Sequence, residues 1–320
     1  MGEAAPLFGV AGAEPPPGAQ AEWFAGAGGA RLRAALIPAA GTPRGSVVVS
    51  PGRTEPIEKY FEMAARLASR GFVVVVHDWR GQGLSARVLA DRSLGHADGY
   101  AEFLEDYADL LAAFEARLPK PWLAIGHSMG GCLTLLVLAH GENRFAGALL
   151  SAPMLGLLTG QAPRPVARAL AGLFNALGRG GQAVFGPPAV EAPFEGNILT
   201  HDPVRYARNL ALVEAAPDLA LGLPTWGWLD FAFSATRELQ SGPGVRRVTI
   251  PVVVLAAGED ALVDNAALRR VAARLPHGRF ELVPAARHEL FQETDEIQSQ
   301  VWRAFDELAG VQERLAVSPS

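Results

Sequence analysis

A chain of 320 residues is long enough for one large α/β domain that carries an insertion. Hydrophobic residues make up 49% of it and charged residues 19%, which supplies a large core and excludes a disordered or fibrous protein. The net charge of −5 contains no basic block that would indicate nucleic-acid binding, and the single cysteine, Cys132, excludes an intramolecular disulfide and a cysteine-based zinc site.

The first 20 residues are rich in Ala, Gly and Pro, and we predict an irregular N-terminal extension there. They lack a basic leader followed by an unbroken apolar region, so we expect no secretory signal. No uncharged apolar stretch in the sequence reaches the roughly 18 residues of a membrane-spanning helix. The sequence therefore predicts a soluble, cytoplasmic protein, for which peripheral contact with a membrane stays open.

Short apolar runs alternate with helical patterns along most of the chain. Segments near Trp23 and at 32–37 flank a Gly-rich turn and predict an antiparallel hairpin. Later runs are apolar on both faces, as the strands of a covered parallel sheet are: residues 47–49, 72–76, 122–125, 147–150, 252–255 and 280–283. Helical patterns occur at residues 57–69, 100–118, 132–139, 266–275 and 297–308. This alternation predicts a doubly wound α/β core.

The alternation breaks between residues 152 and 244, where prolines, aromatic residues and short helical pieces replace the strand-like runs. We predict a helical lid (152–244) over the sheet, which divides the core into residues 21–151 and 245–320. The lid rings of Trp226 and Trp228 could line an apolar substrate pocket, although core packing explains either ring equally well. A lid surface that contacts a bilayer is a further hypothesis.

Ser128 is the candidate nucleophile. It lies in a G-H-S-M-G run at 126–130, between the strand predicted at 122–125 and the helix predicted at 132–139. A G-x-S-x-G run at such a junction forms a tight turn that lifts the serine hydroxyl above the sheet. The backbone N–H of Met129 then faces the hydroxyl and can bind an oxyanion.

The loop after the strand at 47–49 is expected to supply a second oxyanion donor. It reads S-P-G-R-T at 50–54, and Gly52 allows the chain to turn back so that the Arg53 N–H is available. The Arg53 side chain could reach the substrate or pair with Glu55. An ordinary strand-to-helix turn is the competing interpretation for that side chain.

A catalytic serine needs a histidine base and a carboxylate that orients it, in the chain order Ser, acid, His. Three carboxylates follow the strand at 252–255. Asp264 is interpreted as the N-cap of the next helix and Glu259 as a solvated turn residue, so Asp260 is the preferred acid. Of the seven histidines, only His288 follows the last predicted strand, and it is therefore the predicted base.

These residues resemble the lysophospholipase and monoacylglycerol lipase branch of the α/β-hydrolases, over about residues 47–305. The resemblance is carried by G-H-S-M-G-G at 126–131, D-W-R-G-Q-G-L-S at 78–85, G-E-D-A-L-V-D at 258–264 and R-H-E at 287–289. The S-P-G-R run at 50–53 and the lid segment at 197–203 are more similar to the bacterial lysophospholipases. In that branch the acid is the carboxylate that matches Asp260.

The resemblance implies an α/β-hydrolase fold, a mostly parallel central sheet flanked by helices under a helical lid. It also implies hydrolysis of a single-chain acyl ester without cofactor or metal, and it does not fix the head group. A prolyl-type aminopeptidase shares fold, triad and lid, but it needs carboxylates for the substrate amine, and the apolar lid offers no obvious cluster of them. A non-catalytic binding protein of the same fold would lack a triad member, and all three are present. We interpret the 78–85 segment as structural, with Asp78 paired to Arg80 and the loop bracing the elbow around Ser128.

Overall fold

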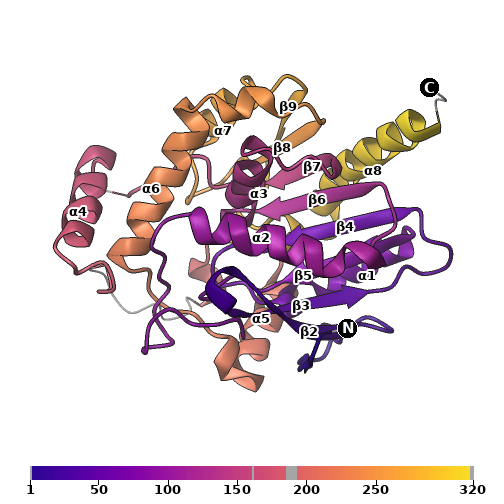
Figure 1. Ribbon diagram of the computed structural model, residues 1–320, viewed down its shortest axis with the longest axis horizontal. Helices are drawn as coiled ribbons and strands as arrows, with labels where there is room; N and C mark the ends of the chain where they lie inside the picture. Colours follow the sequence, from indigo (N-terminus) through magenta and orange to yellow (C-terminus); the bar gives the residue numbers. More distant parts are fainter. Residues whose placement is uncertain (1, 161, 185–192, 318–320) are drawn as a thin grey trace.

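The computed structural model describes residues 2–160, 162–184 and 193–317. Within these residues, nine strands form one sheet in the order β1-β2-β3-β5-β4-β6-β7-β8-β9 (Figure 1). The strands are β1 (Ala4–Ala5), β2 (Gln20–Ala25), β3 (Arg31–Ile37), β4 (Gly45–Ser50), β5 (Phe72–His77), β6 (Trp122–His127), β7 (Phe145–Ser151), β8 (Val252–Ala257) and β9 (Gly278–Val283).

The sheet is antiparallel at one end and parallel through β4 to β9. The predicted hairpin is the β2–β3 pair, in which Trp23 lies opposite Arg33. The N-terminal extension is less irregular than predicted, because Ala4 and Ala5 pair with β2 as the edge strand β1. The parallel arrangement brings the carboxyl ends of β4, β6 and β8 to the same edge of the sheet.

The helices alternate with the strands as the sequence predicts. They are α1 (Phe61–Ser69), α2 (Ala101–Phe114), α3 (Met129–Ala139), α4 (Arg164–Ala176), α5 (Pro203–Ala215), α6 (Trp226–Ser241), α7 (Asn265–Ala272) and α8 (Asp295–Val317). Short 3-10 helices lie at η1 (Ala27–Gly29), η2 (Ile57–Tyr60), η3 (Glu115–Arg117), η4 (Phe194–Gly196), η5 (Pro217–Leu219), η6 (Gly244–Arg247) and η7 (Leu290–Gln292). Figure 1 shows α2 and α3 in front of the strands. Helix α1 meets α8 where Arg66 lies over the ring of Trp302.

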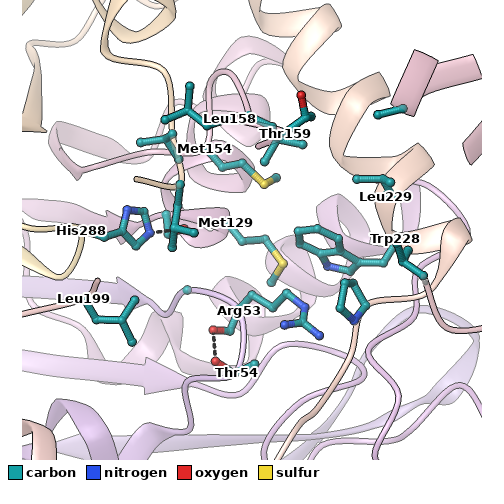
Figure 2. Close-up of a pocket in the computed structure, with 18 of the residues that line it drawn as sticks. Arg53, Thr54, Met129, Met154, Leu158, Thr159, Leu199, Trp228, Leu229 and His288 are labelled. Atoms are coloured by element: carbon teal, nitrogen blue, oxygen red, sulfur yellow. Dashed lines mark hydrogen bonds between the residues drawn. The ribbon is translucent and has the colours of Figure 1, made fainter. Parts of the chain in front are cut away.

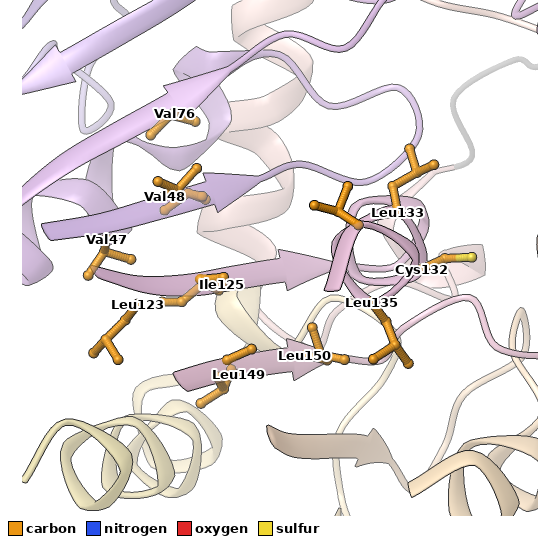
Figure 3. Close-up of a cluster of buried hydrophobic side chains, with 14 of the residues drawn as sticks. Val47, Val48, Val76, Leu123, Ile125, Cys132, Leu133, Leu135, Leu149 and Leu150 are labelled. Carbon is orange, nitrogen blue, oxygen red and sulfur yellow. The ribbon is translucent and has the colours of Figure 1, made fainter. Parts of the chain in front are cut away.

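The core lies on the parallel strands. Every residue of β4, β5, β6 and β8 is buried, which is what apolar runs on both faces predict. Figure 3 shows Val48, Ile125 and Leu150 of this sheet near Leu133 and Leu135 of α3. The helix α3 is itself buried along its whole length, so the turn that precedes it is anchored on both sides.

The segment predicted as a lid contains α4, α5 and α6 in its described part, and residues 161 and 185–192 of that prediction lie outside the described residues. Figure 1 shows α4 as the outermost of these helices, beside α6. No helix in the described ranges has both the length and the apolar composition to cross a membrane.

Candidate active site

Ser128 occupies a strained turn between β6 and α3. Its backbone has φ 51° and ψ −116°, a conformation that costs energy for a residue with a side chain and is stored at functional sites. Glycines make the turn possible. A Cβ on Gly130 would lie 2.1 Å from the carbonyl oxygen of Ser50, and one on Gly126 would lie 2.7 Å from Cα of Gly131. The close approach of β4, β6 and α3 therefore depends on the absence of side chains at these positions.

The structure brings Ser128, His288 and Asp260 together in one hydrogen-bonded chain. Nε2 of His288 lies 2.9 Å from Oγ of Ser128, and Nδ1 lies 2.8 Å from Oδ2 of Asp260. The other carboxylate oxygen of Asp260 accepts the N–H groups of Leu262 and Val263, at 2.8 and 3.0 Å. Burial raises the pKa of Asp260, but the hydrogen bonds from His288 and the backbone outweigh it, and the net pKa is lowered.

The two competing carboxylates, Asp264 and Glu259, do not contact the predicted base, and Asp264 has the capping role that the sequence predicts. Asp264 caps α7 by accepting the N–H of Ala266 at 3.0 Å. Glu259 is half-exposed and lies 3.2 Å from the ring of His201. Neither is hydrogen-bonded to His288, so the geometry separates Asp260 from both alternatives.

The two predicted oxyanion donors, the N–H groups of Arg53 and Met129, lie just after the ends of β4 and β6. Met129 is the first residue of α3, and Arg53 lies in the loop that follows β4. Within the described residues, neither N–H donates a hydrogen bond. The Arg53 loop is fixed from outside, because the N–H of Thr54 donates to Oε1 of Gln82 at 2.5 Å and Trp79 donates to the carbonyl oxygen of Pro51 at 2.8 Å.

The 78–85 segment thus supports the loop beside the elbow, but its predicted internal ion pair is wrong. Asp78 binds Nε of Arg33 at 2.7 Å, and Arg80 binds Asp106 at 2.8 Å. Both partners come from other elements, β3 and α2, which lie next to the segment in space and far from it in sequence.

The predicted alternative of an Arg53–Glu55 pair is wrong as well. Glu55 accepts the N–H of Gly52 at 2.5 Å and binds Nζ of Lys59 at 2.7 Å. Lys59 also binds Glu289, at 2.6 Å, and all of these side chains are buried. Burial raises the pKa of Glu55, but Lys59 and His127 outweigh it and lower that pKa to about 2.

A cavity of about 630 Å³ opens above Ser128 (Figure 2). Its lining is mostly apolar and comes from the core, from the segment after β7 and from the lid: Met129, Met154, Leu157, Leu158, Leu170, Val184, Leu199, Trp226, Trp228, Leu229, Leu262 and Val263. The structure places both predicted lid tryptophans in this wall. Trp226 also stacks on Phe174, with ring centroids 4.6 Å apart, so it packs within the lid while it borders the cavity.

Comparison with known proteins agrees with this geometry. The sequence pattern of the serine aminopeptidase S33 family (Hydrolase_4) matches residues 41–295. Lysophospholipase L2 of Escherichia coli strain K12 is 35% identical over 267 residues, 79% of this chain and 76% of the relative. A monoacylglycerol lipase of Mycolicibacterium smegmatis is 29% identical over 285 residues, 85% of this chain and 91% of that one.

This chain belongs to the lysophospholipase and monoacylglycerol lipase-like α/β-hydrolases. Its fold matches the crystal structure of a soluble monoglyceride lipase variant from Saccharomyces cerevisiae in complex with a substrate analog, with a TM-score of 0.74. The two sequences are 19% identical, and the match covers 96% of this chain and 99% of the other. The predicted fold class and the family resemblance are both confirmed.

In this lysophospholipase-like hydrolase, the loop that carries His288 is held by the lid segment 197–202, here called the clasp. Leu199 accepts the N–H of Glu289 at 2.9 Å, and the buried hydroxyl of Thr200 donates to the carbonyl oxygen of Gln292 at 2.6 Å. The ring and the N–H of His201 both contact the carboxylate of Glu293, each at 2.9 Å. The clasp therefore connects the lid to the predicted catalytic base.

Sequence reasoning did not find Lys59 and Glu289 at the site, nor the role of the clasp. Glu289 directly follows His288, and this position indicates that it lies near the site. Its partner Lys59 lies 230 residues earlier in the chain, so the sequence does not indicate their pairing. The sequence of the clasp carries a resemblance to the bacterial lysophospholipases, but nothing in it indicates which loop the clasp binds.

Proposed function

We propose that this protein hydrolyses carboxylic esters of single-chain lipids, lysophospholipids or monoacylglycerols, through an acyl-enzyme. The observation that carries the proposal is the hydrogen-bonded chain Asp260–His288–Ser128 at the floor of an apolar cavity. The names of its relatives, lysophospholipase L2 and monoacylglycerol lipase, support the same class of substrate.

The geometry supports a two-step acyl transfer. Oγ of Ser128 attacks the ester carbonyl carbon while Nε2 of His288 takes the hydroxyl proton. The N–H groups of Arg53 and Met129 stabilise the negative charge that forms on the carbonyl oxygen. His288 then gives its proton to the departing alcohol oxygen, and the acyl group remains on Ser128. A water molecule, deprotonated by His288, releases the fatty acid and restores Ser128.

Asp260 keeps the imidazole in the orientation and tautomer that this cycle needs. Its hydrogen bond to Nδ1 leaves Nε2 free to accept the serine proton. Its lowered pKa keeps the carboxylate charged at neutral pH, so it stabilises the imidazolium that forms in the transition state.

The cavity suits an acyl chain better than a substrate amine. Its walls are apolar around Met154, Leu170 and Trp226. Glu55 and Glu289 also border it, but both are bound to Lys59, so neither offers a free charge to an ammonium group. This pairing argues against the aminopeptidase alternative.

We also propose that helix α4 places the cavity mouth on a lipid surface. Val166, Leu170, Leu173 and Leu177 form one exposed apolar stripe, in which Leu173 is 52% and Leu177 63% exposed. Residues 164–179 contain arginines and no acidic residue, a composition typical of helices that lie on anionic membranes. Leu170 borders the cavity as well, so the stripe is continuous with the site.

A fluorophosphonate probe and a substrate panel test the catalytic proposal. Ser128 should be labelled covalently, and Ser128→Ala should abolish both labelling and turnover. The panel compares a lysophospholipid, a monoacylglycerol, a short p-nitrophenyl ester and a proline arylamide of matched concentration. Preference for the arylamide, or full turnover by His288→Ala, would overturn the proposal.

A further inference from the structure

The Arg53 side chain lies in the cavity wall in an unusual electrostatic position. Its guanidinium donates one hydrogen bond, from Nη2 to the carbonyl oxygen of Gly222 in the lid, and lies 5.3 Å above the ring of Trp228. Its Nε is buried and has no hydrogen-bond partner. Among the residues that the structure describes, no carboxylate lies within ion-pair distance of Arg53.

Two other buried cations of the protein are neutralised by carboxylates. Arg33 is bound by Glu58 and Asp78, and Lys59 by Glu55 and Glu289. A buried charge without a counter-ion is costly, since it gives up water and receives no compensating charge. Burial lowers the pKa of Arg53 to about 10, which still leaves the guanidinium protonated at neutral pH. The cavity wall therefore holds an uncompensated positive charge.

Arg87 shows what a purely structural arginine of this kind looks like in the same protein. Burial lowers its pKa to about 10 as well, and its Nε, like that of Arg53, is buried without a hydrogen-bond partner, but its guanidinium donates to the carbonyl oxygens of Gly81, Gly83 and Ala220. Arg87 does not border the cavity. Arg53, by contrast, has a single carbonyl partner and faces the cavity.

The position of Arg53 relative to the reacting ester is defined by its own backbone. Its N–H is the proposed oxyanion donor, so the side chain begins at the scissile carbonyl and runs away from it toward Trp228. Figure 2 shows Arg53 and Thr54 on one side of the cavity and Leu158 and Thr159 on the other. A glycerol ester bound at Ser128 with its acyl chain on the apolar side would direct its glycerol end toward the guanidinium.

We propose that Arg53 and Trp228 form an anion subsite that binds the head-group phosphate of a lysophospholipid. A guanidinium presents parallel N–H donors that match two phosphate oxygens, and the aromatic ring stabilises the cation when the site is empty. The subsite makes lysophospholipid the preferred substrate over monoacylglycerol, which has a neutral hydroxyl at that position. This assignment rests on the proposed ester hydrolysis.

The test compares two octanoyl substrates, 1-octanoyl-glycerophosphocholine and 1-octanoylglycerol, both kept below their micelle concentrations so that surface binding does not contribute. Arg53→Gln should lower kcat/KM for the phospholipid by about tenfold to a hundredfold more than kcat/KM for octanoylglycerol, the difference expected for charge-assisted hydrogen bonds to the phosphate. Arg53→Lys should recover part of the loss, because it restores the charge without the paired donors.

Arg87→Gln is the matched control, since it removes a guanidinium with a similarly lowered pKa that lies outside the cavity. It should leave the ratio of kcat/KM for the two substrates unchanged. Equal losses of kcat/KM on both substrates in Arg53→Gln would overturn the subsite. The Arg53 side chain would then serve the oxyanion site or the folding of the loop. If the wild-type protein cleaves neither ester, the proposed function fails instead, and the two failures are distinct.

Inorganic phosphate distinguishes a lipid head group from a free anion. Competitive inhibition of octanoylglycerol hydrolysis by phosphate, lost in Arg53→Gln, supports an anion subsite when it accompanies the selective loss on the phospholipid. Loss of phosphate inhibition without any change in the substrate ratio would overturn the head-group assignment, because the site would then bind only free phosphate.

Discussion

At the scale of single residues, the assignment of Asp260 is open to a direct measurement. Asp260→Asn should lower kcat on a p-nitrophenyl ester by about 10⁴-fold, because an amide cannot hold His288 in the required tautomer or stabilise its charged form. Asp264→Asn is the control, since asparagine keeps the cap of α7 and should leave kcat within about twofold. The reverse pattern would identify Asp264 as the acid.

The sequence was informative about these residues where chain order and capping constrain the answer. Ser128, Asp260 and His288 each follow a predicted strand, and parallel strands bring such positions to one edge. It was wrong about ion pairs. Proximity in sequence favours Arg80 as the partner of Asp78 and Arg53 as the partner of Glu55. The structure pairs Asp78 with Arg33 and Glu55 with Lys59, because the fold brings these side chains together and buries them.

At the scale of elements, the apolar stripe of α4 predicts binding to vesicles that contain anionic lipid. The double variant Leu173→Ser/Leu177→Ser should weaken co-sedimentation by about tenfold or more, because each leucine loses its transfer into the lipid interface. Leu282→Ser removes a comparably exposed leucine from β9 and should have no effect. Equal binding by the α4 variant and the wild-type protein would contradict membrane contact through this helix.

The clasp gives a second prediction at this scale. Thr200→Val keeps the side-chain shape but leaves the carbonyl oxygen of Gln292 and the N–H of Asp202 without their partner. We expect the free energy of unfolding in urea to fall by about 1–3 kcal/mol, and kcat to fall with it as the His288 loop loosens.

Thr236→Val is the matched control for the clasp. Its buried hydroxyl donates to the carbonyl oxygen of Phe233 within the same helix α6. Thr236→Val should therefore lower the free energy of unfolding and kcat less than Thr200→Val does. An unchanged kcat in Thr200→Val, together with the expected loss of stability, would limit the clasp to a structural role.

Elements were predicted best where periodicity is strong and worst at their ends. The buried strands and α1, α2 and α7 follow their apolar patterns. Helix α3 begins at Met129 rather than at 132, because the glycines after Ser128 are helical only in the context of the tight packing against β4. The strand β1 has no β-branched residue and exists only through its pairing with β2.

At the scale of the whole molecule, buried histidines determine how stability depends on pH. Burial lowers the pKa of His77 to about 3 and that of His127 to about 4, the latter against the opposing attraction of Glu55. Both rings are therefore neutral in the folded protein. Below pH 6.5 the unfolded chain binds protons at these residues that the folded protein does not, so the folded state loses stability as the pH falls. A net charge of −5 gives no indication of this effect, whose largest cause at both residues is burial.

His77 isolates one proton of this linkage, because it does not border the cavity and contacts Ser50, Trp79 and Tyr107. In His77→Gln, the slope of unfolding free energy against pH should decrease by about 1.4 kcal/mol per pH unit between pH 6 and 5, the value for one proton. The lowered pKa of Glu55 affects stability only below about pH 4.5, outside this window. Urea unfolding at each pH measures the slope, and the exposed His277→Gln is the control. An unaltered slope in His77→Gln would mean that His77 takes up a proton without unfolding.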